Sequence, residues 1–272
     1  YCNYIFSKRR WKNVKKKSYI NQHLNVIVPY TTIAKIIQKF ANGLGYEIWH
    51  IPRDYSQEDK EIMNVAARYT MTDFAAKKML IEGIKHIVKH QIEGCFVECG
   101  VWKGGSIIIM LKTLQKLGIS DREIYLFDTF EGMSKPIESD VNVVGKVALN
   151  YEEEERKETY ASLEEVKKVV FKTGYDRSKI HFVKGKVEDT LPDNKINKIA
   201  ILRLDTDYYE STKAEFEFLY PKLSVNGVLI VDDYGVWKGA KKATDEYLGK
   251  IKSRIFLSRI NPLGAIIGIK TQ

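Results

Sequence analysis

From residue 94 onward, the sequence alternates between short apolar runs and segments whose apolar residues have helical spacing. Strands that alternate with helices form βαβ units, so this pattern predicts a mostly parallel sheet with helices on both faces. The strands are expected at 94–99, 123–128, 180–184, 199–204 and 228–231, and the helices at 105–118, 159–173, 211–220 and 238–251.

Two more strands are expected near 253–258 and 264–270, separated by the short turn "NPLG". A turn of this length joins antiparallel neighbours, so the sheet should end in an antiparallel hairpin. The predicted fold class is therefore α/β and Rossmann-like, with a seven-stranded sheet. The terminal hairpin distinguishes it from the plain dinucleotide-binding fold.

Residues 1–68 are expected to form an N-terminal extension made of a basic arm and helices. Helical spacing appears over 30–43 and 56–68, and a third helix is expected at 73–90. The sheet domain should then occupy 69–272. Within it, the irregular segment 131–158 is too long for an ordinary connection, which indicates an active-site lid or a mobile insertion.

The net charge of +9 is concentrated in the first twenty residues. Such an arm could bind nucleic acid or an anionic membrane, but no nucleic-acid motif follows it, and a solvated terminus is the simpler interpretation. No window approaches the roughly 18 apolar residues of a membrane helix. The cysteines, Cys2, Cys95 and Cys99, lack framework spacing. Reduced thiols and a cytoplasmic location are therefore expected.

The ends of the first three predicted strands carry features suited to an adenosine cofactor. The first strand runs into "VECGVWKGGS" (97–106), whose glycines permit close backbone approach to a ligand at a helix N-terminus. Trp102 holds the second glycine position, so this is not a GxGxxG turn. The second strand ends in Asp128, which can accept hydrogen bonds from both ribose hydroxyls, and the third leads into 183–192, where adenine would lie. Each feature alone could be ordinary loop structure.

Carboxylates follow the next two predicted strands. Asp205 and Asp207 come after 199–204, and Asp232 and Asp233 come after 228–231. Asp205, Asp232 and Asp233 would repel one another at a shared sheet edge unless a cation lay between them. An oxygen-only cluster suits a hard divalent ion such as Mg²⁺ or Mn²⁺. The alternative is that these acids are helix caps and solvated loop ends.

Seven motifs, in order, resemble the macrocin/mycinamicin sugar O-methyltransferase family of class I S-adenosylmethionine-dependent methyltransferases. They are "TMTDFAAKKML", "FVECGVWKGGS", "LFDTFEGM", "FVKGKVEDTLP", "LRLDTDYYEST", "YPKLSVNGVLIVDDYG" and "GAKKATDEY". The resemblance runs from about Tyr69 to Tyr247 and is specific. Lys103 departs from it mildly, because the family usually has Arg there.

The resemblance implies where S-adenosylmethionine would bind. The glycine loop would cradle it, with the ribose on Asp128, the adenine against Val187–Asp189 and the methionine end near Thr72. The residues expected at this cofactor are Thr72, Glu98, Gly100, Val101, Gly104, Gly105, Ser106, Asp128, Thr129, Val187, Glu188 and Asp189.

The expected activity is metal-dependent transfer of a methyl group to a sugar hydroxyl of a small molecule. A metal chelated by two vicinal hydroxyls would lower their pKa, and Asp205 would take the proton, with Asp207 as the competing base. Aromatic residues near the strand ends could stack on a sugar or pack in the core: Trp102, Tyr208, Tyr209, Tyr234 and Trp237.

Other functions are also compatible with the sequence. Methylation of a catechol-like phenol would use the same metal chemistry, and a nucleic-acid-binding module would use the basic arm. A nicotinamide oxidoreductase is disfavoured by Trp102 and by the hairpin. A homodimer is expected, because three apolar-faced helices before the first strand exceed what one sheet face needs.

Overall fold

The computed structural model describes residues 2–8, 26–28, 40, 46–50, 54–134, 136–138, 140–148, 159–261 and 264–272. The chain divides into two compact units, Tyr1–Glu61 and Ile62–Gln272.

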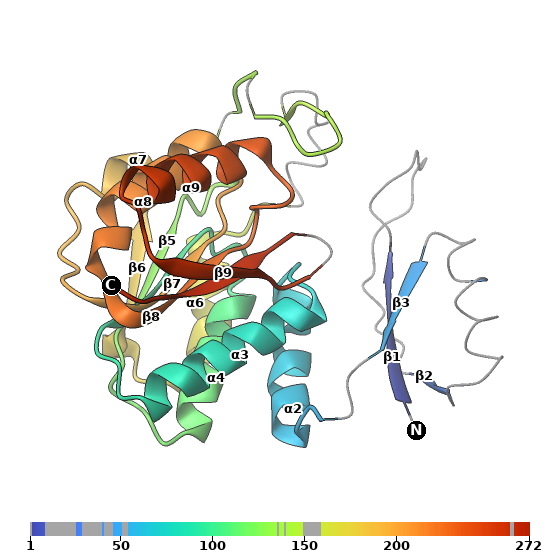
Figure 1. Ribbon diagram of the computed structural model, residues 1–272. Coiled ribbons are helices and arrows are strands. Elements are labelled where there is room, and N and C mark those ends of the chain that lie inside the picture. The colour runs from blue at the N-terminus through green and yellow to red at the C-terminus, as the bar shows by residue number, and fades with distance from the viewer. Residues whose placement is uncertain are drawn as a thin grey trace. The chain divides into compact units, whose positions relative to one another are not determined.

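The larger unit is built around a seven-stranded sheet (Figure 1). Its strands are β4 (Cys95–Cys99), β5 (Ile124–Asp128), β6 (Ile180–Lys184), β7 (Ile199–Leu204), β8 (Leu223–Val231), β9 (Ile255–Arg259) and β10 (Ile266–Lys270). Their order is β6-β5-β4-β7-β8-β10-β9, with β4 to β8 parallel and β10 antiparallel to both β8 and β9. The predicted fold class is confirmed, although β8 begins at Leu223 rather than at residue 228.

Helices cover both faces of this sheet, with α3 and α4 on one side and α8 and α9 on the other (Figure 1). The helices are α2 (Gln57–Ala66), α3 (Phe74–Lys89), α4 (Gly105–Lys116), α6 (Leu163–Phe171), α7 (Val187–Thr190), α8 (Tyr209–Phe218) and α9 (Lys238–Lys250), with 3-10 turns at Ala67–Tyr69, Arg177–Lys179 and Tyr220–Lys222. Every residue of β4 and β7 is buried. Strands covered on both faces read as apolar runs rather than alternating patterns, which explains their sequences.

Two helices begin at side-chain caps that satisfy free backbone amides. The Asp73 carboxylate accepts from the Ala76 amide at 2.8 Å and starts α3. Ser162 and Glu165 form a reciprocal capping box at the start of α6. Such caps typically contribute about 1 kcal/mol each, and they explain why α6 starts several residues after the predicted position of 159.

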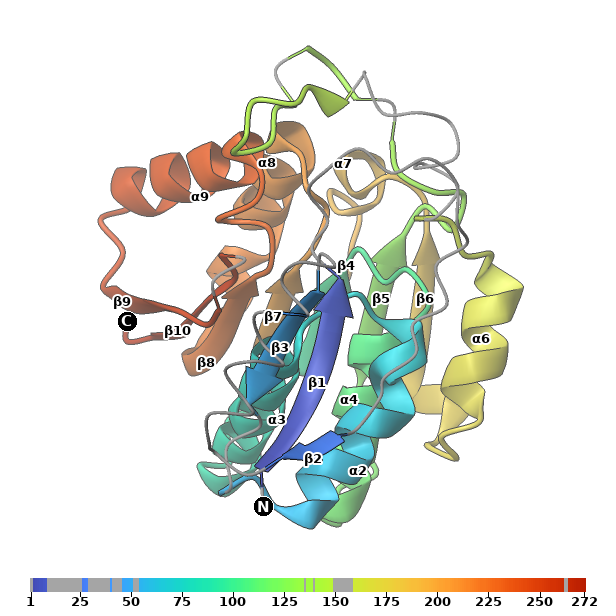
Figure 2. The same ribbon diagram turned by 90° about the vertical axis from the view of Figure 1, so that its right-hand side faces the viewer.

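The N-terminal unit differs from the expectation of a basic arm followed by helices. It holds an antiparallel sheet of β1 (Cys2–Lys8), β2 (Val26–Val28) and β3 (Tyr46–His50), in the order β2-β1-β3 (Figure 2). The strand at residues 2–8 was not expected, although "CNYIFSK" contains the aromatic and β-branched residues that favour strands. The basic residues of the expected arm, between 9 and 17, lie outside the described residues. The helix expected at 30–43 lies outside the described residues, except for helical Phe40.

The argument for a dimer required three helices before the first sheet strand. Two of them are α2 and α3, and the third falls on 30–43, outside the described residues apart from Phe40. The oligomeric state stays a prediction.

The described part of the expected lid is attached to the loop that follows β8. The Val143 amide donates to the Val236 carbonyl at 2.9 Å, and the Lys238 amide donates to the Val141 carbonyl at 3.0 Å. Ala148 is buried against Tyr208. Residues 140–148 therefore lie beside the carboxyl edge of the sheet, while 149–158 fall outside the described chain.

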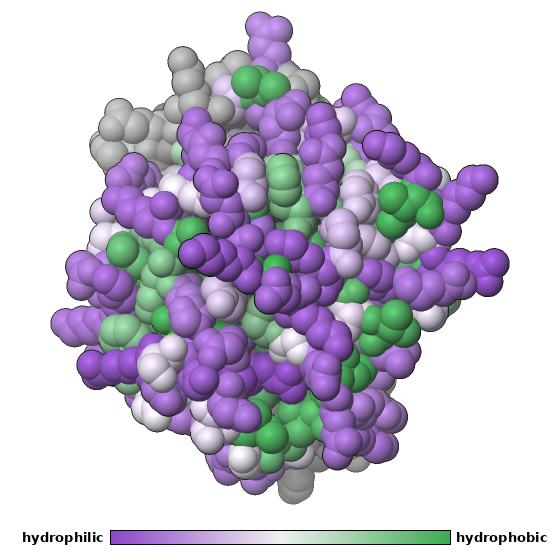
Figure 3. Space-filling model, turned by 90° about the vertical axis from the view of Figure 1, so that its left-hand side faces the viewer, coloured by the Kyte–Doolittle hydropathy of each residue, from purple (hydrophilic) through white to green (hydrophobic). Residues whose placement is uncertain are grey.

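Cys95 and Cys99 are free and buried, and burial raises the pKa of both thiols, to about 12 at Cys95. Both behave as small apolar residues. Figure 3 shows a face with mainly hydrophilic side chains and scattered apolar ones. No helix in the described ranges is both long and apolar enough to cross a membrane.

Candidate active site

The parallel register places the ends of four strands next to one another. The Gly100 amide donates to the Phe127 carbonyl, the Asp205 amide to the Cys99 carbonyl, and the Asp232 amide to the Leu204 carbonyl, each at 2.9 Å. Each ladder hydrogen bond thus extends one residue past the strand end. As a result the glycine loop, Asp205 and Asp232 meet at a single edge, where open α/β sheets bind ligands.

The backbone of Gly100 lies very close to the backbone of Asp205. The φ of Gly100 is +82°, and a Cβ atom there would lie 1.9 Å from the carbonyl oxygen of Asp205. Gly105, the first residue of α4, would place a Cβ 2.5 Å from the Cβ of Thr70. Only glycine permits both contacts. The loop therefore brings the N-terminus of α4, with its free amides and positive dipole end, close to the neighbouring strand ends.

Asp128 at the end of β5 holds this loop in place. Its Oδ2 accepts from the amides of Val101 at 2.7 Å and Trp102 at 3.0 Å, and its Oδ1 accepts from the Phe130 amide at 2.7 Å. Trp102 and Phe130 have positive φ angles of 47° and 51°. The carboxylate thus stabilises two strained loop residues, a role that the sequence alone did not reveal.

The other residues predicted at the cofactor lie around the same loops. Val187 is buried in the single turn of α7, Glu188 is half-buried and Asp189 is exposed. The hydroxyl of Thr129 donates to the Gly132 carbonyl at 2.5 Å. Ser106 is buried in the first turn of α4. The assignment of these side chains to adenine and ribose stays a prediction.

Replacing Asp128 with Ala is expected to weaken S-adenosylhomocysteine binding by about tenfold or more, since hydrogen bonds to charged groups contribute roughly 1.5–3 kcal/mol. Asp128→Asn is the matched variant, because it keeps the size of the side chain and one acceptor oxygen for the loop amides but loses the charge and the second acceptor. Calorimetry on the folded variants measures the S-adenosylhomocysteine affinity of each. Unchanged affinity in both variants would remove Asp128 from the cofactor site.

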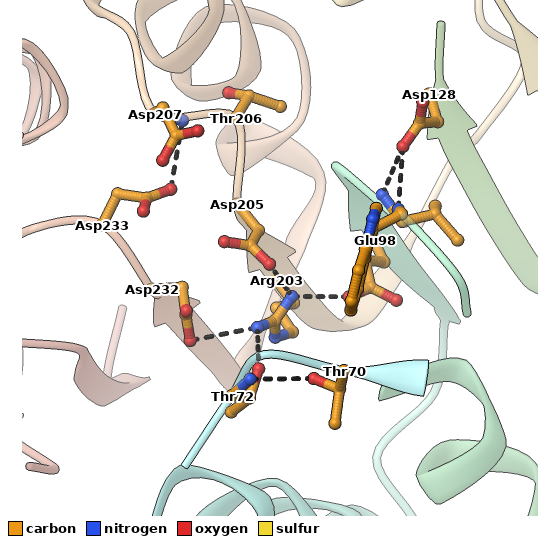
Figure 4. A network of polar contacts seen from close by, with 12 residues as sticks. Thr70, Thr72, Glu98, Asp128, Arg203, Asp205, Thr206, Asp207, Asp232 and Asp233 are labelled. Atoms are coloured by element: carbon orange, nitrogen blue, oxygen red, sulfur yellow. Dashed lines mark hydrogen bonds and ion pairs between the residues drawn. The ribbon is translucent and has the colours of Figure 1, made fainter. Parts of the chain in front are cut away.

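Arg203 is the central residue of the site, and no sequence motif predicted it (Figure 4). It is only 2% exposed. Its Nη1 donates to Glu98 Oε1 at 2.5 Å and to Asp205 Oδ2 at 2.7 Å. Its Nη2 donates to the Thr72 hydroxyl at 3.1 Å and lies 3.0 Å from Asp232 Oδ1. A single basic residue inside the apolar run 199–204 was the signal that could have revealed it.

Asp205, Asp232 and Asp233 converge as predicted. One carboxylate oxygen from each lies within 4.8 Å of those of the other two. Asp232 Oδ1 is buried and receives no hydrogen bond within the described chain, although Arg203 is near. Three adjacent carboxylates with an unsatisfied oxygen fit the oxygen donor set that Mg²⁺ and Mn²⁺ prefer.

Asp207 lies beside Asp233 and away from Arg203 (Figure 4). Its amide donates to Asp233 Oδ2 at 3.0 Å, and its φ is +68°. A positive φ in an aspartate costs energy, so the Asp233 contact helps to hold this strained turn. Asp207 therefore contributes both its backbone amide and the charge of its side chain to the acid cluster.

Burial and mutual repulsion raise the pKa of several site carboxyls. At Asp205 burial is the largest cause, Arg203 opposes it, and the charges of Asp232 and Asp233 add to it. At Asp233 burial comes first and the charge of Asp207 second. Burial also raises the pKa of Glu98 to about 7, against the effect of Arg203. Such carboxyls retain protons unless a further positive charge is close.

A second buried acid supports the loop after β7. Glu215 on α8 is fully buried and accepts from the Thr206 hydroxyl at 3.0 Å. Burial raises its pKa well above the ordinary value, which favours the neutral form. Its contact with Thr206 fixes the segment between Asp205 and Asp207. This residue too was not found from the sequence, because it occurs among the other charges of "YESTKAEFEF".

The aromatic residues divide between packing and surface contacts. The rings of Tyr208 and Trp237 are buried and meet edge to face, with centroids 5.5 Å apart. The hydroxyls of Tyr209 and Tyr234 hydrogen-bond at 2.7 Å to Glu246 and Asp245 on α9. For Tyr208 and Trp237 the core-packing alternative is therefore correct.

Comparisons with known proteins agree with this geometry. A family model described as macrocin O-methyltransferase (TylF) matches residues 12–266. Demethyldecarbamoylnovobiocin O-methyltransferase of Streptomyces niveus is 34% identical over 187 residues, which are 68% of this chain and 70% of that protein. A Streptomyces olivaceus 4'-O-methyltransferase, named for 8-demethyl-8-(2,3-dimethoxy-alpha-L-rhamnosyl)-tetracenomycin C, is 32% identical over 181 residues, which are 66% of this chain and 68% of that protein.

The fold comparison gives the same result. The structure of the O-methyltransferase NovP matches with a TM-score of 0.64 and 28% identity, covering 81% of this chain and 90% of that chain. The sheet order with its terminal hairpin, the glycine loop and the family match all lead to one assignment. The chain belongs to the macrocin O-methyltransferase family of class I S-adenosylmethionine-dependent methyltransferases.

Proposed function

We propose that this enzyme methylates a hydroxyl of a sugar in a glycosylated small molecule, with a divalent ion at Asp205, Asp232 and Asp233. The observation that carries the proposal is the convergence of these three carboxylates within 4.8 Å, next to the glycine loop. The names of two relatives support the acceptor class. One includes a dimethoxy-rhamnosyl group, and another is Mycinamicin III 3''-O-methyltransferase of Micromonospora griseorubida, 27% identical over 179 residues.

The cofactor would lie along the glycine loop, beside Asp128 and Thr72. Backbone amides at the start of α4 suit the carboxylate end of S-adenosylmethionine, because a helix N-terminus binds anions. The Thr72 hydroxyl accepts from Arg203 at 3.1 Å, and the same guanidinium contacts Asp205 and Asp232. The methyl group would thereby be directed toward Asp205.

The transfer itself requires an alcohol that loses its proton as it attacks the methyl carbon. A new carbon–oxygen bond forms, the carbon–sulfur bond breaks, and the sulfonium becomes a neutral thioether. Arg203 holds Asp205 by Oδ2, and Oδ1 accepts no hydrogen bond from the residues that the structure describes. Asp205 Oδ1 would accept the proton, which fits a carboxyl whose pKa is raised.

A bound Mg²⁺ or Mn²⁺ would supply positive charge that acidifies and orients the sugar hydroxyl. The chain's own contribution is the arrangement of the acids. Arg203 orients Asp205 and lies beside Asp232, and the Asp207 amide orients Asp233.

Removing divalent ions with EDTA is expected to abolish methyl transfer to a glycoside, and Mg²⁺ or Mn²⁺ should restore it. S-adenosylhomocysteine binding should persist, since the predicted adenosine contacts lie on β4, β5 and β6 while the acids follow β7 and β8. A radiolabelled methyl assay and calorimetry measure the two effects separately.

The assay should use a panel of glycosides with vicinal hydroxyls and include a catechol as the comparison acceptor. Full activity in EDTA would contradict the metal-dependent mechanism. Exclusive methylation of the catechol would contradict the sugar acceptor and leave the metal chemistry intact.

A further inference from the structure

Arg203 connects parts of the site that the proposed function treats separately. Its guanidinium contacts Glu98 on β4 and Thr72 before α3, both expected at the cofactor. The same group contacts Asp205 at 2.7 Å and Asp232 at 3.0 Å, both expected at the metal. One buried cation is therefore shared between the cofactor residues and the metal residues.

The charges around Arg203 do not balance. Glu98, Asp205, Asp232 and Asp233 form a group of four carboxylates, and Arg203 contacts three of them. Asp233 is held instead by the Asp207 amide. When ionised, these carboxylates carry more negative charge than Arg203 offsets, and a further cation favours that ionised state. Arg203 offsets part of that charge.

Arg203 also uses oxygens that belong to the candidate metal ligands. Its Nη1 donates to Asp205 Oδ2, and its Nη2 lies beside Asp232 Oδ1. Its side chain is on the same strand face as Asp205, because residues two apart in an extended chain point the same way. A divalent ion between the three aspartates would thus be near a fixed positive charge, which opposes its binding.

We propose that Arg203 is a positioning residue that assembles Asp205 and Asp232 before the divalent ion binds, and whose charge lowers the affinity for that ion. This inference rests on the metal-dependent function proposed above. Neutralising Arg203 should therefore raise the affinity for the divalent ion, whereas loss of a residue with a purely structural role should lower that affinity.

Mg²⁺ calorimetry on three full-length variants tests this sign. Arg203→Met should tighten Mg²⁺ binding by about tenfold, and Arg203→Lys, which keeps the charge, should stay within about threefold of the unchanged protein. Glu98→Gln is the matched control on the other side of the guanidinium. Because it removes a negative charge, it should weaken Mg²⁺ binding by about threefold or more. Weaker binding in Arg203→Met would overturn the proposal.

A second measurement, made in EDTA, tests the positioning role without any metal. Arg203→Met leaves Glu98 buried without its counter-ion and should lower the melting temperature. Adding Glu98→Gln to that variant should recover part of the loss. Additive destabilisation by the two changes would contradict a counter-ion role. If Arg203→Met does not fold, Arg203→Gln provides the neutral side chain. If adding Glu98→Gln to Arg203→Gln then fails to raise the melting temperature, that result would also contradict a counter-ion role.

These results separate the inference from the proposed function. Absence of Mg²⁺ binding by the wild-type protein would overturn the metal-dependent mechanism. The melting temperatures of the Arg203 and Glu98 variants would still decide whether Arg203 holds the carboxylates together. Equally strong Mg²⁺ binding by Arg203→Met and Arg203→Lys would be consistent with the metal-dependent mechanism. It would contradict the proposal that the charge of Arg203 lowers the affinity for Mg²⁺.

Discussion

Asp205→Asn is expected to reduce the rate of methyl transfer by roughly 10²–10⁴-fold, the usual effect of losing a general base. The amide keeps an oxygen that can accept from Arg203, so the side chain should remain in place while its capacity to take a proton is lost. Radiolabelled methyl transfer measures the rate, and calorimetry with S-adenosylhomocysteine checks that the cofactor site survives.

Asp207→Asn is the matched control for this change. Asp207 is only two residues away, and the hydrogen bond from its backbone amide to Asp233 is preserved by the substitution. Its rate should fall far less than that of Asp205→Asn. The opposite ranking would make Asp207 the base and would contradict the mechanism proposed for Asp205.

Gly100→Ala is expected to destabilise the fold by more than about 4 kcal/mol, a size reached only when a substitution disrupts buried structure. The new Cβ would lie 1.9 Å from the Asp205 carbonyl oxygen and 2.6 Å from its carbonyl carbon. Neither backbone can retreat easily, because the Gly100 and Asp205 amides are both in ladder hydrogen bonds of 2.9 Å. Urea unfolding followed by circular dichroism measures the loss.

Alanine substitutions at two other glycines distinguish backbone strain from the close approach to Asp205 as causes of the lost stability. Gly118 has a φ of +74° but nothing within 4 Å of its Cβ position, so Gly118→Ala should cost only the strain of about 1–2 kcal/mol. Gly249 also has open space and lies in α9, where Ala should be stabilising by up to about 1 kcal/mol. A loss at Gly100 no larger than at Gly118 would show that the close approach to Asp205 is not rigid.

Much of the larger unit could be predicted, because its local patterns agree with its tertiary structure. The buried strands read as apolar runs, and β6 and β7 were predicted with their observed bounds, Ile180–Lys184 and Ile199–Leu204. The start of α3 was predicted from Asp73, which the structure shows to be a cap. The strand Cys2–Lys8 was not predicted, since a nearby run of basic residues outweighed the strand propensity of "CNYIFSK".

The sequence by itself determined the seven strands, the terminal hairpin and the carboxylates that follow β7 and β8. These follow from local rules, since periodicity defines a strand and parallel strands bring their carboxyl ends to one edge. Only the tertiary structure decided what those carboxylates contact. Glu98 and Arg203 are 105 residues apart in the chain, and they meet at 2.5 Å because the sheet places β4 directly beside β7. With β8 on the other side of β7, Asp232 also reaches the guanidinium. Part of the positive charge that the three aspartates require is thus supplied by an arginine whose partners no local pattern could reveal, because strand order depends on contacts far apart in sequence.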